Sequence, residues 1–186
     1  MKTNKWIYAI VLASLVWVAC DDDDETLDRP SLNDADETYV EKAARSNMAE
    51  IKFGELAATK ATDSVVRAYA QEMVTEHTTA QNELEEIADD FKGVEWPNDL
   101  DEGHDEIKNQ LDEADGYSFD SLYISTQVMM HEDARAMFAT ATTGSTEARV
   151  KAYASKYLPH IEMHLEKADS IQAAVTANGG TDDGTN

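Results

Sequence analysis

Basic residues, cysteine, glycine and proline are all scarce in this chain. Its 186 residues include 15 Lys and Arg against 38 Asp and Glu, which gives a formal net charge of −23. This balance excludes nucleic acid as a partner, because phosphate binding requires clustered Lys and Arg. The single cysteine excludes a disulfide framework and cysteine-rich zinc modules. Eight glycines and three prolines are too few for a sheet-rich fold with many tight turns.

The N-terminus has the features of a secretory signal. Lys2 and Lys5 precede an apolar stretch over residues 7–19, which is too short to span a bilayer. The stretch ends at Cys20, so residues 1–19 resemble a bacterial lipoprotein signal peptide, which is removed before a cysteine that then carries lipid. An uncleaved anchor and a conventional secretory signal are the alternatives, but the position of the lone cysteine favours the lipoprotein.

Residues 20–35 are predicted to form an acidic tether. The run of acidic residues at 21–25 would repel itself and stay solvated. Similar runs after a lipidated cysteine serve in some Gram-negative bacteria as a signal for export to the cell surface. We therefore expect an extracytoplasmic protein that the lipid on Cys20 holds to the outer membrane, on its periplasmic face or at the cell surface.

The remainder of the chain predicts an all-α fold over residues 36–175, followed by a disordered tail over 176–186. Apolar residues recur at alternating spacings of three and four, which is the period of a helix seam in a bundle. Thr62 and Thr146 are predicted to be N-caps. The four long helices are expected at about 35–59, 63–91, 118–142 and 147–175.

An internal repeat indicates how these helices pair. The sequence of residues 66–70 recurs with one conservative change at residues 150–154, an offset of 84. This repeat predicts two similar helical hairpins. The link over 93–117 is much longer than a simple up-down bundle needs, and it is expected to hold a short helix at about 105–111. Such a link suits a crossover along the bundle, so we predict a ferritin-like four-helix bundle.

Several stretches of this predicted bundle resemble one family. The resemblance is to an uncharacterised family of exported bacterial ferritin-like helical proteins, often labelled outer-membrane proteins of unknown function. It implies a helical fold and an export route, and it implies no established activity. The stretches that carry it are Gly-Glu-Leu-Ala at 54–57, Glu-Met-Val-Thr-Glu-His at 72–77, Gly-Tyr-Ser-Phe-Asp at 116–120, Met-His at 130–131 and His-Leu at 164–165.

Histidines in the helical seams are the candidate functional residues. His77 and His164 each stand in the middle of an otherwise apolar seam, and His131 lies at the flank of the third long helix. Glu50 lies among small residues of the first. The helical rise places all four within about two turns of the bundle centre. They could therefore converge on a divalent metal ion such as Fe, Cu or Zn.

Two alternatives to a metal site shared by all four residues stay open: a structural polar network, and an ion held by His160 together with His164. The histidines could form a structural polar network, bonding to one another, to a buried carboxylate or to tyrosines. A standard di-iron site requires Glu-x-x-His on two helices, but Val74 and Ile161 stand three residues before His77 and His164. The sequence therefore argues against that site. His160 could join His164 on one ion, although the proline at 159 disturbs that turn.

The sequence leads to two functional hypotheses. The first is a non-enzymatic, lipid-anchored envelope or surface protein that binds a small molecule or a protein through its helical bundle. The alternative is a metal-binding protein that uses His77, His131, His164 and Glu50, with a role in redox chemistry or storage. No phosphate-binding loop or nucleophile motif indicates a catalytic residue.

Overall fold

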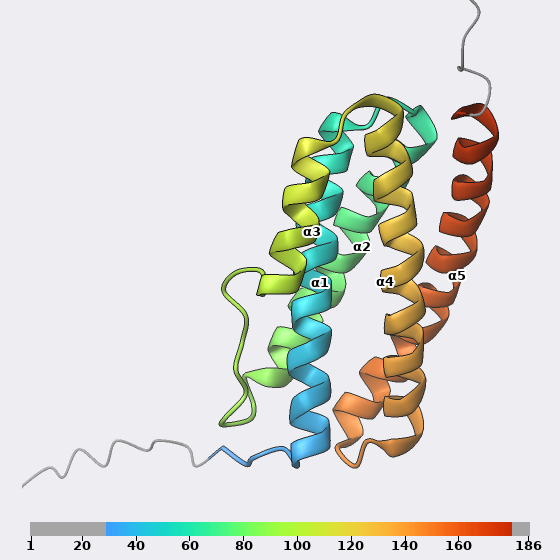
Figure 1. Ribbon diagram of the computed structural model, residues 1–186. Coiled ribbons are helices and arrows are strands. Elements are labelled where there is room, and N and C mark those ends of the chain that lie inside the picture. Colours follow the sequence, from blue (N-terminus) through green and yellow to red (C-terminus); the bar gives the residue numbers. More distant parts are fainter. Residues whose placement is uncertain (1–28, 180–186) are drawn as a thin grey trace, which may run out of the picture.

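The computed structural model describes residues 29–179, which form an all-helical bundle (Figure 1). The predicted signal peptide, Cys20, the acidic run at 21–25 and residues 180–186 lie outside this range. None of the described helices is long and apolar enough to cross a membrane. The helices are α1 (Asp34–Lys60), α2 (Ser64–Ala88), α3 (Glu102–Glu113), α4 (Gly116–Gly144) and α5 (Ala148–Gly179).

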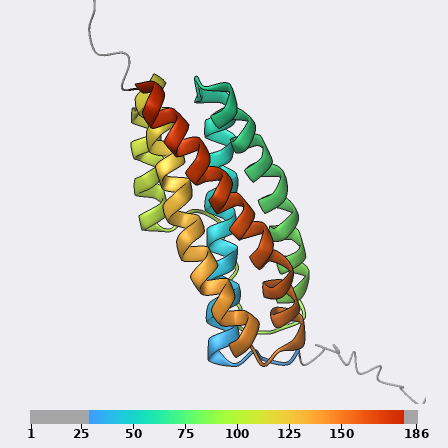
Figure 2. The same ribbon diagram turned by 90° about the vertical axis from the view of Figure 1, so that its right-hand side faces the viewer.

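The long helices form two antiparallel hairpins, as the repeat predicted. In Figure 1, α1 and α5 run upward, whereas α2 and α4 run downward. The connection from α2 to α4 travels along the bundle and includes α3, which packs against α1 and α4. One long crossover of this kind distinguishes ferritin-like bundles from simple up-down bundles. It brings α1 against α4 and α2 against α5, which places all four long helices around one axis (Figures 1 and 2).

The C-terminal ends of α2 and α5 differ from the prediction, and α3 and α4 extend two or three residues beyond their expected bounds at both ends. The second long helix ends at Ala88, earlier than the expected residue 91, and the chain then turns toward Gly93, which has a φ of 93°. A positive φ suits glycine because it has no Cβ. At the other end of the chain, α5 continues to Gly179, so residues 176–179 belong to the helix and the tail was predicted to start too early.

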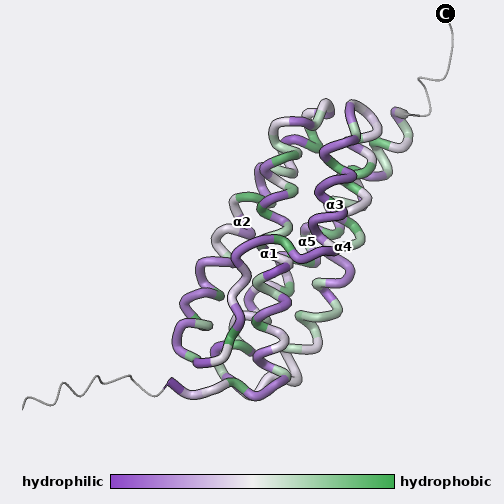
Figure 3. The backbone as a smooth tube through the Cα atoms, turned by 60° about the vertical axis from the view of Figure 1, so that its left-hand side comes forward, coloured by the Kyte–Doolittle hydropathy of each residue, from purple (hydrophilic) through white to green (hydrophobic). Residues whose placement is uncertain are grey.

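The apolar seams of α2 and α5 are buried as predicted, but that of α4 is rotated. His131, which was predicted at the flank of α4, is buried together with Ile124 and Phe138, whereas Leu122 and Met137 are only partly buried. The apolar residues of α4 cover a wide arc, and such an arc does not indicate which part faces the core. Hydrophilic and hydrophobic segments alternate along the long helices in Figure 3.

The first hairpin packs closely at Gly54. A Cβ at this position would lie 2.8 Å from Cγ2 of Val74 and 3.0 Å from the carbonyl oxygen of Ala70. Both contacts are shorter than ordinary van der Waals distances, so glycine allows α1 to approach α2 at the level just beyond Glu50.

At each end of the bundle, a buried aspartate of one hairpin accepts hydrogen bonds from residues at the start of a helix of the other hairpin. Asp36 accepts hydrogen bonds from the amides of Thr146 (3.1 Å) and Glu147 (2.9 Å), and Asp120 accepts them from the amides of Thr62 (3.0 Å) and Asp63 (2.8 Å). The two threonines were predicted to be N-caps, which is wrong. The carboxylates take their place at the helix N-termini, where the helix dipole favours negative charge.

The N-cap of α2 is instead Asp63, one residue later than predicted. Its side chain accepts hydrogen bonds from the amides of Val65 (2.6 Å) and Val66 (3.3 Å). Both threonine hydroxyls donate to the opposing aspartate, Thr62 to Asp120 and Thr146 to Asp36. The two hairpins are therefore joined at both ends by the same arrangement, with the region between them left for the histidines.

Candidate metal centre

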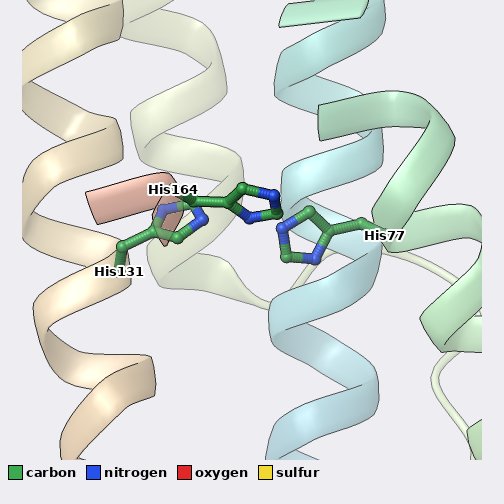
Figure 4. A group of neighbouring side chains, drawn as sticks. All are labelled: His77, His131 and His164. Atoms are coloured by element: carbon green, nitrogen blue, oxygen red, sulfur yellow. The ribbon is translucent and has the colours of Figure 1, made fainter. Parts of the chain in front are cut away.

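Three of the predicted site residues meet in the middle of the bundle, one from each of three helices. His77 comes from α2, His131 from α4 and His164 from α5 (Figure 4). Their ring centroids are 5.4 to 5.8 Å apart, and one nitrogen of each ring lies within 4.8 Å of one nitrogen of the others. Their exposures are 9%, 1% and 2%, so the cluster is shielded from solvent.

His77 is held by a hydrogen-bonded chain that fixes its tautomer. Its Nδ1 lies 2.9 Å from Oδ1 of Asn47, while Nδ2 of Asn47 donates to the hydroxyl of Tyr153 (3.0 Å). That hydroxyl in turn donates to the carbonyl of Ala80 (3.2 Å). Because Tyr153 uses its one hydrogen on this carbonyl, Asn47 must present its oxygen to His77. The proton of His77 is therefore on Nδ1, and Nε2 carries a lone pair.

His131 is held from its Nδ1 side as well. Nδ1 donates to the backbone carbonyl of Gln127 (2.9 Å), which can only accept. Oε1 of Glu50 lies 3.5 Å from the same nitrogen, and Oε2 of Glu50 accepts from the side chain of Gln127 (2.8 Å). Glu50 thus reaches the cluster as predicted, but it contacts the outer side of the imidazole. This position suits a residue that orients His131 rather than a ligand.

His164 is held by a carboxylate that the sequence analysis did not single out. Its Nε2 lies 3.1 Å from Oε2 of Glu76, which also contacts Nδ1 of His160 at 3.2 Å. An ionised carboxylate only accepts hydrogen bonds, so the proton of His164 is on Nε2 and the lone pair on Nδ1. A signal for Glu76 was present, because it directly precedes His77 and stands in the stretch Glu-Met-Val-Thr-Glu-His.

The three inner nitrogens are left without hydrogen bonds. Within residues 29–179, Nε2 of His77, Nε2 of His131 and Nδ1 of His164 have no protein partner. All three ring protons point outward, so the imidazoles cannot bond to one another. The three imidazoles help to line a cavity that also reaches Glu76 and His160, and its volume of about 20 Å³ is enough for one water molecule or one ion. A water can donate to only two nitrogens, whereas a metal ion satisfies all three.

Burial in the cluster favours the neutral form of His77 and His164. Burial, together with neighbouring histidines, lowers the pKa of His77 well below its usual value. Burial and the nearby His131 likewise lower the pKa of His164 to about 4, against the opposing effect of Glu76. Burial raises the pKa of Glu50, an effect that His131 and Gln127 partly offset. Neutral imidazole is the form that binds metal, so few protons compete for the inner nitrogens of His77 and His164 at neutral pH.

The other histidines and the tyrosines take different positions. His104 of α3 is partly buried, and its Nδ1 lies 2.9 Å from Oδ2 of Asp101. Tyr69 bonds the backbone carbonyl of His164 (3.3 Å), and Tyr157 bonds Glu83 (2.8 Å), so neither hydroxyl reaches an imidazole. Of the partners that the sequence left open, the imidazoles bond neither to one another nor directly to a tyrosine among the described residues, but they do contact carboxylates, those of Glu50 and Glu76.

Comparison with known proteins identifies the family of the chain. The chain belongs to the family described as a domain of unknown function, DUF4142, whose profile matches residues 23–171. This match covers most of the chain, including every residue of the histidine cluster. No curated protein and no solved structure matches the chain.

Proposed function

We propose that this member of a family without an established activity binds one transition-metal ion through Nε2 of His77, Nε2 of His131 and Nδ1 of His164. The observation that supports this most directly is the set of three buried lone pairs that face one cavity while each opposite ring nitrogen is fixed by an acceptor. Such outer partners orient metal-binding histidines and fix their tautomers.

The ligand chemistry favours zinc or copper. Imidazole nitrogens suit Zn²⁺ and copper, whereas hard ions such as Mg²⁺ and Ca²⁺ prefer carboxylate and carbonyl oxygens. Three protein ligands leave a position for water or another small molecule, as in zinc sites that are not purely structural. The two buried or half-buried carboxylates, Glu50 and Glu76, offset part of the ion's positive charge from outside its ligand shell. Storage of metal as a mineral is not implied, because the cavity has room for a single ion.

A polar network that serves packing alone is a weaker account of these side chains. A buried polar group without a partner costs about 1–3 kcal/mol, and this cluster contains three such nitrogens. Each has a partner on its outer side that holds the lone pair inward. A network that serves packing alone would be expected to satisfy its buried polar atoms, and these three inner nitrogens are without a protein partner among the described residues.

The location proposed for this function follows from the signal sequence. The lipid-type signal and Cys20 support attachment to the outer membrane outside the cytoplasm, where the bundle would meet metal ions of the envelope or the surroundings. Replacing Cys20 by serine should release the protein into the soluble fraction. Fractionation of cells that express each form tests this, and an unchanged membrane-bound fraction would contradict it.

The metal proposal is tested by equilibrium dialysis of the purified protein against Zn²⁺ or Cu²⁺, followed by elemental analysis. We expect one ion per chain for the wild type and for His104→Ala, a matched histidine variant outside the cluster. His77→Ala, His131→Ala and His164→Ala should each lose stoichiometric binding. Equal metal content in all five proteins would overturn the proposal, as would a wild type that takes up none.

A further inference from the structure

A second group of metal-ligating side chains lies directly outside the histidine cluster, where α2 faces α5. It consists of Glu72 and Glu76 from α2 and His164 from α5, and His160 from α5 lies beside it. The side chains of Glu72, Glu76 and His160 are 29%, 34% and 46% exposed. Oε2 of Glu76 lies 3.2 Å from Nδ1 of His160. Unlike the inner cluster, this group can meet an ion that arrives from solvent.

The two groups share one residue, His164. Ligand atoms of Glu72, Glu76 and His164 lie within 4.8 Å of one another, as do those of the three inner histidines. His164 is 2% exposed and has no protein partner among the described residues for its Nδ1. Its Nε2 contacts Glu76 at 3.1 Å. One imidazole therefore lies between the half-exposed group and the buried one.

The cavity of the inner cluster extends to this side of the bundle. Its lining includes Glu76 and His160 together with the three inner histidines. His131, which is 1% exposed, lies behind the others and is backed by Gln127 and Glu50. An ion that binds the inner nitrogens must reach them from the surface, and His160 is the exposed ligand-bearing residue of this lining.

A lysine stands where a cation would first arrive. Nζ of Lys167 pairs with Oε2 of Glu72, and both side chains are partly exposed, at 45% and 29%. Exposed ion pairs of this kind contribute little free energy, so an arriving dication can displace the ammonium group. The carboxylate of Glu72 is therefore paired with an ammonium group that an arriving ion would have to replace.

We propose that Glu72, Glu76 and His160 form a capture site for a divalent transition-metal ion, which passes from there to the inner histidines beside His164. This inference rests on the proposed function, because it assigns a route to the site proposed there. The carboxylates attract the hydrated ion, His160 supplies a first imidazole, and His164 is in contact with both groups. The capture site is occupied transiently, so the protein holds one ion at equilibrium.

Rapid mixing of the full-length protein with Zn²⁺ and a zinc indicator dye tests this route. Glu72→Gln combined with His160→Ala removes two capture ligands and leaves Glu76 and the inner histidines in place. We expect uptake to slow by about tenfold, in line with the effect of charge on association rates. Release to a chelator should slow by the same factor, because both directions use one route, and the final stoichiometry should stay at one ion.

Matched charge variants separate a specific route from a general electrostatic effect. Glu162→Gln removes an exposed carboxylate of α5 outside the capture site and should leave the uptake rate within about twofold. Lys167→Gln frees Glu72 and should speed uptake, whereas Lys151→Gln, an exposed lysine elsewhere on α5, should not.

Each outcome decides between the two proposals. If the wild type binds one Zn²⁺ and the double variant loads as fast as Glu162→Gln, the capture site is wrong and the inner site stands. If the double variant loses stoichiometry, its residues hold the resident ion and the capture site is again wrong. If the wild type binds no Zn²⁺, both proposals fail.

Discussion

At one end of the bundle Asp36 accepts hydrogen bonds from Thr146 and Glu147, and at the other end Asp120 accepts the equivalent bonds from Thr62 and Asp63. The sequence repeat has an offset of 84 residues, and the same offset separates the equivalent residues of the two ends. The pairs are Asp36 and Asp120, Thr62 and Thr146, and Asp63 and Glu147. The ends of the molecule are therefore two copies of one arrangement, each made by a carboxylate of one hairpin and the helix start of the other.

The middle of the bundle departs from this repeat. Under the same offset His131 corresponds to Asn47, His77 to Ile161 and His164 to Ala80. No histidine of the cluster has a histidine as its equivalent, and Asn47 instead supplies the acceptor that holds His77. The repeated residues join the two hairpins, whereas the residues that break the repeat supply the candidate metal centre.

The strongest test of this difference restores the repeat at one histidine. His77→Ile introduces isoleucine, the residue found at the equivalent position 161, and isoleucine fits a buried helical position. We expect metal affinity to fall by at least about a thousandfold, or about 4 kcal/mol, with unchanged helical content by circular dichroism. The stability of the metal-free protein should change little, because the variant removes one unpaired nitrogen but also leaves Oδ1 of Asn47 without its donor. A cooperative bundle that still binds metal tightly would contradict this assignment.

The next largest effect is expected at the two ends. Asp36→Ala and Asp120→Ala each leave helix-end amides and a threonine hydroxyl without their charged acceptor. Each should lower the free energy of unfolding by about 3 kcal/mol, measured by urea denaturation of the metal-free protein. Because the ends are equivalent, the two losses should agree within about 1 kcal/mol. Metal stoichiometry should be unaffected, and a loss of binding in either variant would show that the ends and the middle are coupled.

A smaller effect is expected when an outer partner of a histidine is removed. Asn47→Ala takes away the acceptor of His77 Nδ1 but none of the three inner nitrogens. Metal affinity should fall by about 10- to 100-fold, with one ion still bound at saturation in an isothermal titration. An affinity equal to that of the wild type would mean that Asn47 serves packing only.

The smallest expected effect is the pH dependence of the stability of the metal-free protein. His77 and His164 have lowered pKa values in the folded state, that of His164 to about 4. Between the unfolded value of 6.5 and about 4 the unfolded chain binds more protons, so stability should fall as pH falls through this window. The raised pKa of Glu50 acts in the opposite direction, with stability lost as pH rises.

Comparison with a histidine variant isolates the contribution of the imidazole. His164→Gln keeps a neutral polar side chain at this position but does not titrate. Urea midpoints measured from pH 7 to pH 4 should show a shallower loss of stability for His164→Gln than for the wild type. Parallel curves for the two proteins would contradict the assignment of this pH dependence to His164.

The seams and the repeat could be predicted because each depends on residue types at fixed spacing. The burial of α2 and α5 follows from an unbroken period of apolar residues, and the two hairpins follow from one recurring segment. The convergence of His77, His131 and His164 was also predictable, since helical rise fixes their height in the bundle. The rotation of α4 was not, because its apolar arc is too wide to select one direction.

The amino-acid sequence by itself determined an acidic helical bundle of two related hairpins with three histidines at one level. Only the tertiary structure decided which nitrogen of His77 and His164 faces inward, because that depends on acceptors brought from other helices: Asn47 of α1 for His77, and Glu76 of α2 for His164. It also decided that Asp36 and Asp120 hold the opposite hairpins together. Period and spacing place a residue at a height and on a face, but they do not choose its partners.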